Sequence, residues 1–136
     1  MKIGVLIVTH YRLGEEFLQA LRLILPEAPT FEAVSVDPKM PVEEVRSSIA
    51  AGLARADRGS GVLILTDMFG GTPSNMSLSF HDEHQVEVVT GMNLPMLIKL
   101  ATLTEDKPLD ELAPFIKAYG QRNISVASEL VPEGGA

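Results

Sequence analysis

Residues 2–9 of the chain, KIGVLIVT, form a nearly continuous run of β-branched and aliphatic side chains. Such a run is the pattern of a strand that is covered on both faces, because a strand with one exposed face alternates apolar and polar residues. Strands of this kind occur in parallel sheets that have helices packed against them. The run therefore predicts a central parallel strand, and it restricts the fold to classes that provide covering helices.

The segments that follow alternate between helical and strand patterns. Apolar residues recur at helical spacing over residues 13–25, where Pro26 ends the helix, and again over residues 42–56. Further strands are predicted over residues 31–36, 62–66 and 86–90, and further helices over residues 74–80, 96–103 and 109–119, the last of them capped by Gly120. Strands that alternate with helices indicate an α/β domain with a mostly parallel sheet and right-handed crossovers.

The C-terminal segment differs from the rest of the chain. Residues 123–127 form a short β-type run, and residues 131–136, VPEGGA, have the composition of a flexible tail. A chain of 136 residues with 46% hydrophobic content can bury one substantial core, and no internal repeat or linker interrupts it. We therefore expect one domain over residues 1–130, followed by the tail.

Composition argues against several classes of function. The chain has 11 basic and 18 acidic residues, a formal net charge of −7 and no basic stripe, which argues against a nucleic-acid partner. The absence of cysteine excludes disulfides, thiol catalysis and structural zinc ribbons. No apolar run reaches the ~18–20 residues that a membrane span requires, and the N-terminal run lacks the small-residue cleavage site of a signal peptide. These features predict a cytoplasmic protein.

Residues 65–75, LTDMFGGTPSN, combine a strand end, a turn and a helix start. Gly70 and Gly71 permit positive φ angles, and Pro73 suits the first helical position after a Thr72 cap. The first N–H groups of a helix have no partner within it, and the helix dipole adds partial positive charge, so this helix start is a candidate site for a phosphate or carboxylate. An ordinary strand-to-helix connection with a good cap is the alternative.

Candidate reactive groups follow the predicted strands at their carboxyl ends. His10 follows the first strand, Asp67 follows the third, and the turn of Gly91, Met92 and Asn93 follows the fourth. Ligands of parallel α/β sheets gather at these ends, so we expect the three groups to contribute to one site. The alternative is that His10 is a passive strand-end residue, but its coincidence with Asp67 and the glycine-rich turn favours a site.

Three motifs occur in order along the chain: VTH at residues 8–10, GVLILTDMFGGTPSN at residues 61–75 and VVTGMNLPML at residues 88–97. Through them, residues 1–127 resemble the mannose-family IIA domain, of the mannose, fructose and sorbose type, of the bacterial phosphoenolpyruvate-dependent sugar phosphotransferase system. The resemblance implies a doubly wound core of four parallel strands with helices on both faces. It also implies an antiparallel edge strand, here residues 123–127, that is exchanged between the subunits of a homodimer.

The same resemblance implies roles for individual residues. His10 would accept a phosphoryl group from the carrier HPr and hand it to a IIB component, which makes the protein a phosphotransferase of sugar uptake that is peripheral to a membrane permease at most. Asp67 matches the aspartate that orients the histidine, and Thr72 matches a position, usually serine, whose hydroxyl helps to hold the phosphoryl group. The family usually has glycine where Tyr11 stands, so access to His10 or its contacts with partners are expected to differ.

The chemistry of histidine agrees with these roles. A histidine accepts a phosphoryl group through a neutral ring nitrogen with a free lone pair, and a carboxylate on the other nitrogen fixes that tautomer. The same carboxylate repels the incoming group, by about 4 kcal/mol for unit charges 4 Å apart at an effective dielectric constant near 20. The Thr72 hydroxyl and the N–H groups from Gly70 to Ser74 are the candidate donors that offset this repulsion. No metal or cofactor is required, because the phosphoryl group arrives already activated.

Several alternatives remain open. Met68 and Phe69 are either core residues or an apolar docking patch beside the site, and Asn93 either closes the site or serves turn geometry. His81 and His84 have a spacing that permits metal binding, although a polar turn favours solvated side chains. Two functions compete with the phosphocarrier: the phosphotransferase subunit of dihydroxyacetone kinase, which shares the fold and the early histidine, and a regulatory binding module controlled by phosphorylation of the same histidine.

Overall fold

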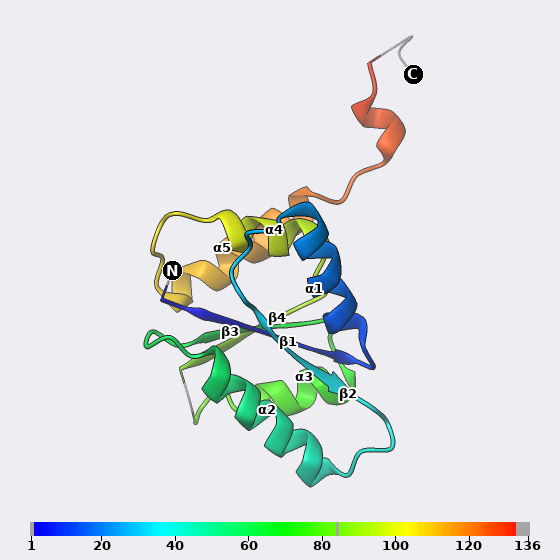
Figure 1. Ribbon diagram of the computed structural model, residues 1–136. Helices are drawn as coiled ribbons and strands as arrows, with labels where there is room; N and C mark the ends of the chain where they lie inside the picture. Colours follow the sequence, from blue (N-terminus) through cyan, green and yellow to red (C-terminus); the bar gives the residue numbers. More distant parts are fainter. Residues whose placement is uncertain (1, 84, 133–136) are drawn as a thin grey trace.

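A four-stranded parallel sheet forms the centre of the structure, a computed structural model that describes residues 2–83 and 85–132 (Figure 1). Its strands lie in the order β2-β1-β3-β4. Each neighbouring pair is parallel, so the prediction of a parallel α/β sheet is confirmed. The strands are β1 (Gly4–His10), β2 (Glu32–Val36), β3 (Val62–Thr66) and β4 (Val86–Thr90).

Helices cover both faces of the sheet (Figure 1). One face packs against α1 (Leu13–Ile24), α4 (Leu94–Thr102) and α5 (Leu109–Arg122), and the other packs against α2 (Val42–Ala56) and α3 (Gly71–Leu78). Each face of the sheet has its own hydrophobic core, and the side chains of β1 alternate between them. Val5 and Ile7 belong to the first core, and Leu6 and Val8 belong to the second. This arrangement confirms the doubly wound architecture and explains why the N-terminal run is apolar at consecutive positions.

The strand order reverses beside β1. The chain leaves β1 to form β2 on one side, and it returns to form β3 and then β4 on the other side. In sheets of this kind ligands bind at the point of reversal, outside the carboxyl ends of the strands. β1 and β3 border that point, and their carboxyl ends carry His10 and Asp67.

The last α-helix is longer than the sequence indicates. The prediction that Gly120 caps this helix is wrong, because α5 continues to Arg122. Gly120 is buried, and a Cβ at this position would lie 2.5 Å from Sδ of Met96 in α4. The glycine therefore permits the close packing of α5 against α4 and does not end the helix.

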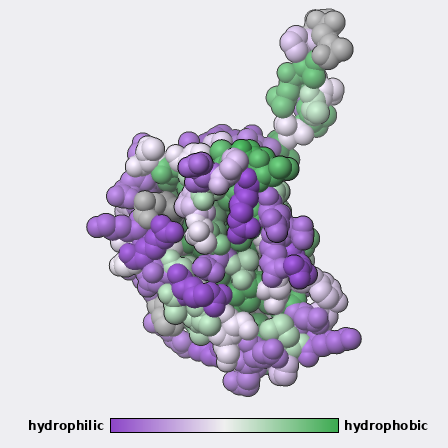
Figure 2. All heavy atoms as spheres, in the orientation of Figure 1, coloured by the Kyte–Doolittle hydropathy of each residue, from purple (hydrophilic) through white to green (hydrophobic). Residues whose placement is uncertain are grey.

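The C-terminal arm, residues 123–132, projects from the body of the protein (Figures 1 and 2). The predicted antiparallel edge strand over residues 123–127 is not found in the described chain, where an irregular segment leads into a 3₁₀ helix, Ala127–Leu130. Every residue of the arm is exposed. A strand requires a hydrogen-bonded neighbour, and in the described single chain this segment pairs with no strand, which explains why the β-type pattern alone does not produce one.

Three further expectations concern membrane crossing, the domain limits and the C-terminal tail. Among the residues that the structure describes, no helix combines the length and the apolarity that a membrane crossing requires. The domain limits at residues 1–130 stay a prediction. The flexibility of the tail also stays a prediction, because residues 133–136 lie outside the described part of the chain.

Candidate functional site

His10 and Asp67 lie side by side at the carboxyl edge of the sheet. Nδ1 of His10 is 2.8 Å from Oδ2 of Asp67, and the backbone N–H of His10 donates to the same oxygen at 3.1 Å. The His10 side chain is 40% exposed, whereas the Asp67 side chain is 13% exposed. His10 ends β1 and Asp67 follows β3, so side chains from two strand ends are in direct contact, and the histidine is the more exposed of the two.

This contact determines which nitrogen of the ring is available. An ionised carboxylate only accepts hydrogen bonds, so the neutral imidazole donates to Oδ2 from Nδ1 and keeps its lone pair on Nε2. The bond from the His10 backbone fixes Oδ2 relative to β1. The other oxygen of Asp67, Oδ1, is buried and has no hydrogen-bond partner within the described chain. Within the described chain, the Asp67 carboxylate thus accepts hydrogen bonds from His10 alone, as expected of a group that orients the ring.

Nε2 lies against the start of α3. A Cβ on Gly71 would lie 3.0 Å from both Cε1 and Nε2 of His10, so a larger residue at this position would press on the ring. The φ angles of Gly70 and Gly71 are +86° and +81°, a region that favours glycine. The glycine pair therefore allows the backbone of the first turn of α3 to approach the free nitrogen.

The first turn of α3 is built differently from the prediction. Gly70 is the N-cap and Gly71 begins the helix, so Thr72 is not the cap and Pro73 is not the first helical residue. The positive φ angles of the two glycines explain the difference, because they turn the chain into the helix before Thr72 is reached. The N–H groups of Gly71 and Thr72 lie in the first turn, where helical N–H groups lack partners within the helix. Thr72 is exposed.

The Ser74 side chain points into the protein. It is fully buried, and its Oγ is 2.8 Å from Oγ1 of Thr66. Both hydroxyls lie within hydrogen-bond distance of the carbonyl oxygen of Met68, and Ser74 donates to that oxygen. The two side chains hold the loop that contains Asp67, so the Ser74 hydroxyl acts on the site through this loop. A direct role of Ser74 would have to come from its backbone N–H.

Two buried threonines directly precede His10 and Asp67 in the sequence and fix the backbone next to them. Thr9 directly precedes His10, and Thr66 directly precedes Asp67. Oγ1 of Thr9 accepts a hydrogen bond from the N–H of Gly14 at 2.8 Å, which fixes the start of α1 relative to β1. Sequence reasoning missed both threonines. The available signal was the repeated pattern of a threonine immediately before each reactive residue.

Met68 and Phe69 lie on the surface next to Asp67. Their exposed fractions are 52% and 75%, so the alternative that they are core residues is wrong. Large apolar side chains that stay exposed next to a reactive group are typical of a surface on which a partner docks. The docking patch is therefore the alternative that we retain for these two residues.

Tyr11 directly follows His10 in the sequence, and its backbone pairs with Val36 at the end of β2. Its φ angle is +47°, which makes it the one non-glycine residue with a positive φ within the described ranges. The N–H of Tyr11 donates to the carbonyl oxygen of Val36 at 2.8 Å. A left-handed backbone costs a residue with a Cβ about 1–2 kcal/mol. The side chain is 59% exposed, so burial offers little compensation for this cost.

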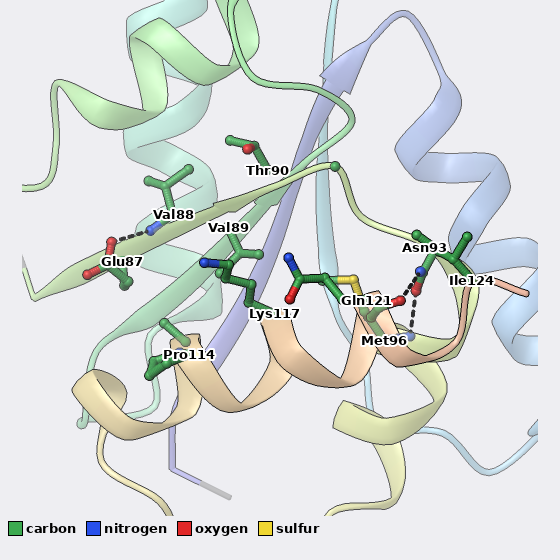
Figure 3. A pocket seen from close by; sticks show the side chains of 13 residues that line it. Glu87, Val88, Val89, Thr90, Asn93, Met96, Pro114, Lys117, Gln121 and Ile124 are labelled. Carbon is green, nitrogen blue, oxygen red and sulfur yellow. Dashed lines mark hydrogen bonds between the residues drawn. The ribbon is translucent and has the colours of Figure 1, made fainter.

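Asn93 lies directly before α4, where the start of this helix meets the C-terminal part of α5. Its Oδ1 accepts a hydrogen bond from the N–H of Met96 at 3.1 Å as the N-cap of α4, and its Nδ2 donates to the carbonyl oxygen of Gly120 at 3.0 Å (Figure 3). Both polar groups of the side chain therefore serve the turn and the packing of the two helices. A binding role of Asn93 stays a prediction.

The other histidines do not form a comparable group in the described chain. Nδ1 of His81 is 3.5 Å from a carboxylate oxygen of Asp82, and Nε2 is 3.6 Å from a carboxylate oxygen of Glu87, both at the surface. No cluster of three or more His, Cys, Asp or Glu side chains among the described residues could hold a metal ion. His84 lies outside the described residues.

Comparison with known proteins gives a consistent result. Residues 4–117 match the sequence pattern of a family described as the fructose IIA component of the PTS system. The mannose-specific EIIAB component of Escherichia coli K12 is 31% identical over 126 residues, which cover 91% of this chain and 39% of that protein. The sorbose-specific EIIA component of Lacticaseibacillus casei is 29% identical over 113 residues, which cover 82% of this chain and 81% of that protein.

Solved structures agree with these sequences. The mannose/sorbose-specific IIA subunit of the phosphotransferase system from Enterococcus faecalis has a TM-score of 0.84 at 30% identity, and the match covers 93% of this chain and 95% of that chain. The EIIA component from Streptococcus agalactiae has a TM-score of 0.82 at 25% identity, with coverage of 93% and 98%. The chain thus spans 39% of the Escherichia coli EIIAB component but nearly all of these two structures.

Proposed function

The chain belongs to the mannose, fructose and sorbose family of IIA components of the sugar phosphotransferase system, and we propose that it is a phosphocarrier of sugar uptake. His10 accepts a phosphoryl group from HPr and passes it to a IIB component. One observation carries the proposal: Asp67 holds Nδ1 of His10 at 2.8 Å, while Nε2 lies against the first turn of α3. We place the protein in the cytoplasm, peripheral to a membrane permease at most.

The proposed transfer exchanges one nitrogen–phosphorus bond for another. Nε2 of His10 attacks the phosphorus with its lone pair, the bond to the donor histidine breaks, and the donor nitrogen keeps the electron pair. The proton on Nδ1 stays in the hydrogen bond to Asp67, whose negative charge stabilises the positive charge that develops on the phosphorylated ring. In the transfer to the IIB component, the bond between phosphorus and Nε2 breaks and Nε2 keeps the electron pair. His10 thereby returns to its neutral form.

The transferred group needs hydrogen-bond donors near Nε2, because the carboxylate of Asp67 repels it. We assign this role to the N–H groups of Gly71 and Thr72 in the first turn of α3, together with the Thr72 hydroxyl. The first turn of α3 contains no acidic residue, so no charge of that turn opposes an anion. The helix dipole adds to the attraction at this end.

Replacing Thr72 with alanine should slow phosphoryl uptake from phospho-HPr about 10–1000-fold, because one donor of an oxyanion-type site is removed. Rapid-quench measurement of phosphate uptake gives the rate. Thr72 is exposed, so the unfolding midpoint should not change. Thr72→Ser keeps the hydroxyl and is the matched control, which should retain the rate. Equal rates for the alanine variant and the unmodified protein would exclude the hydroxyl from the site.

A phosphorylation assay tests the function itself. Incubated with phosphoenolpyruvate, enzyme I and HPr, the protein should gain one phosphoryl group that is labile in acid and stable in alkali, as a phosphoramidate is. A IIB component should then remove this group. Transfer to the nucleotide bound by dihydroxyacetone kinase, and not to IIB, would favour the related kinase subunit. A phosphoprotein that donates to neither acceptor would favour the regulatory binding module.

We further propose a homodimer in which the C-terminal arm of one chain binds the other chain. β4 is an edge strand, and a cavity of about 430 Å³ lies along β4 and α5, with Val89, Lys117 and Gln121 among its lining residues (Figure 3). Pairing with β4 of the partner would give residues 123–127 the neighbour that a strand requires. It would also cover the large apolar side chains that the arm exposes in the single chain, namely Ile124, Val126, Leu130 and Val131.

A chain that ends at Asn123 should be a monomer, because it lacks nearly all of the arm. Residues 124–132 are all exposed in the single chain and none belongs to either core, so their removal leaves the two cores intact. A chain that ends at Leu130 keeps residues 123–127 and serves as the matched control, which should remain dimeric. Sedimentation equilibrium at micromolar concentration measures the mass. An intact chain that sediments as a monomer would contradict the dimer.

A further inference from the structure

We propose that Tyr11 determines specificity for the phosphoryl donor: its exposed ring, held beside His10 by a left-handed backbone, forms one side of the surface on which the donor protein docks. The inference rests on the proposed function, because it takes the donor to be a protein that carries phosphohistidine. Tyr11 is thereby assigned a role in recognition of the donor, and the chemistry of transfer is left to His10.

His10 is flanked by residues with exposed apolar side chains, Tyr11 on the side of β2 and Met68 and Phe69 on the side of β3. On the side of β2, Tyr11 is fixed by the hydrogen bond of its N–H to the carbonyl oxygen of Val36. On the side of β3, the loop after the strand carries Met68 and Phe69, which are 52% and 75% exposed. A donor that brings a phosphohistidine to the His10 side chain, which is 40% exposed, therefore approaches between these residues. In a chain with a formal net charge of −7, this cluster offers an apolar contact at the point of transfer.

The φ angle and the hydrogen bonds of the Tyr11 backbone do not require a tyrosine side chain, so folding does not explain why a tyrosine stands here. Its N–H is bonded to Val36, and its carbonyl oxygen accepts a hydrogen bond from Oγ1 of Thr9 at 3.4 Å. Both bonds use the main chain and are open to any residue, while glycine would adopt the φ of +47° without strain. The ring gains little from burial in the free protein. A contact that forms only in the complex with the donor accounts for an aromatic residue here.

A tyrosine ring is well suited to such a contact. It presents a large and rigid apolar area, and tyrosine is among the residues that contribute most to protein–protein binding. A protein donor has a surface around its phosphohistidine that can pack against the ring. A small phosphoryl donor needs only the lone pair of Nε2 and gains nothing from Tyr11. The role of Tyr11 therefore predicts an effect on the KM for the protein donor and none on the intrinsic reactivity of His10.

Tyr11→Gly and Tyr11→Asn test the inference, because both residues tolerate a left-handed backbone and both remove the ring. Each variant should raise the KM for phospho-HPr roughly 10- to 100-fold and change kcat less than about threefold. The unfolding midpoint of Tyr11→Gly should equal or exceed that of the unmodified protein. Tyr11→Phe keeps the ring and should keep the KM. Phosphoramidate, a small donor, should phosphorylate all of these proteins at the same rate.

Leu23→Asn is the matched surface control, because Leu23 is an 83% exposed apolar residue near the other end of α1. It should leave the KM unchanged. An unchanged KM in Tyr11→Gly would refute the inference, and so would an equal loss of rate with phosphoramidate and with phospho-HPr, which would make Tyr11 a positioning residue for His10. Failure of the unmodified protein to accept phosphate from phospho-HPr would refute the proposed function together with this inference.

Discussion

Replacing His10 with alanine should abolish phosphoryl uptake from phospho-HPr. Among the described residues, His10 is the only histidine that combines an oriented Nδ1, a partly exposed side chain and a position against the first turn of α3. Asp67 cannot replace it, because its carboxylate lies 13% exposed behind the ring. Acid-labile phosphate, measured after incubation with phosphoenolpyruvate, enzyme I and HPr, should fall to the level of a sample without HPr.

His81→Ala is the matched control for this experiment. His81 also lies beside carboxylates, at 3.5 and 3.6 Å from Asp82 and Glu87, so the variant removes a histidine with a similar charge environment. It should take up phosphate at the unmodified rate. Acid-labile phosphate on the His10→Ala protein would move the acceptor to His81 or His84 and overturn the site.

Replacing Asp67 with asparagine should slow phosphoryl transfer by about 10²–10⁴-fold without abolishing it. Oδ2 of Asp67 accepts hydrogen bonds from both the ring and the backbone of His10. An amide can donate as well as accept, so it permits the tautomer in which Nε2 carries the proton and has no lone pair for phosphorus. It also removes the negative charge that stabilises the phosphorylated ring. Single-turnover transfer from phospho-HPr measures the rate.

Asp82→Asn is the control for the loss of one negative charge, because Asp82 is fully exposed beside a different histidine. It should transfer at the unmodified rate. The circular dichroism spectrum and unfolding midpoint of Asp67→Asn report whether the loop remains folded. A folded Asp67→Asn protein with an unchanged transfer rate would show that the carboxylate does not orient His10.

The alternation of strands and helices and the meeting of His10 with Asp67 were predictable from the sequence. Consecutive apolar positions in β1 require two cores, and two cores require helices on both faces. Parallel strands that flank a reversal of strand order then bring their carboxyl ends to one site. Periodicity can be read from a single sequence, whereas the strand order is established by the structure.

The remaining features depend on packing, backbone conformation or strand pairing that the local residue pattern does not record. Gly120 carries the usual signal for a helix end, but its packing against Met96 keeps it inside α5. Thr72 is a good cap in isolation, yet the glycine pair starts the helix first. Residues 123–127 have a strand pattern without a strand to pair with in the described chain. In each case the local signal is real, and tertiary packing, the adjacent glycine pair or the lack of a neighbour overrides it.

The central claim is that Nε2 of His10 is the nitrogen that carries the phosphoryl group. Protein with ¹⁵N-labelled histidines, phosphorylated through phosphoenolpyruvate, enzyme I and HPr, tests it directly by nuclear magnetic resonance, because coupling to phosphorus identifies the bonded ring nitrogen. The hydrogen bond of 2.8 Å between Nδ1 and Asp67 predicts a phosphoryl group on Nε2 and a proton retained on Nδ1. A phosphoryl group on Nδ1 of His10, or on another histidine, would contradict this account.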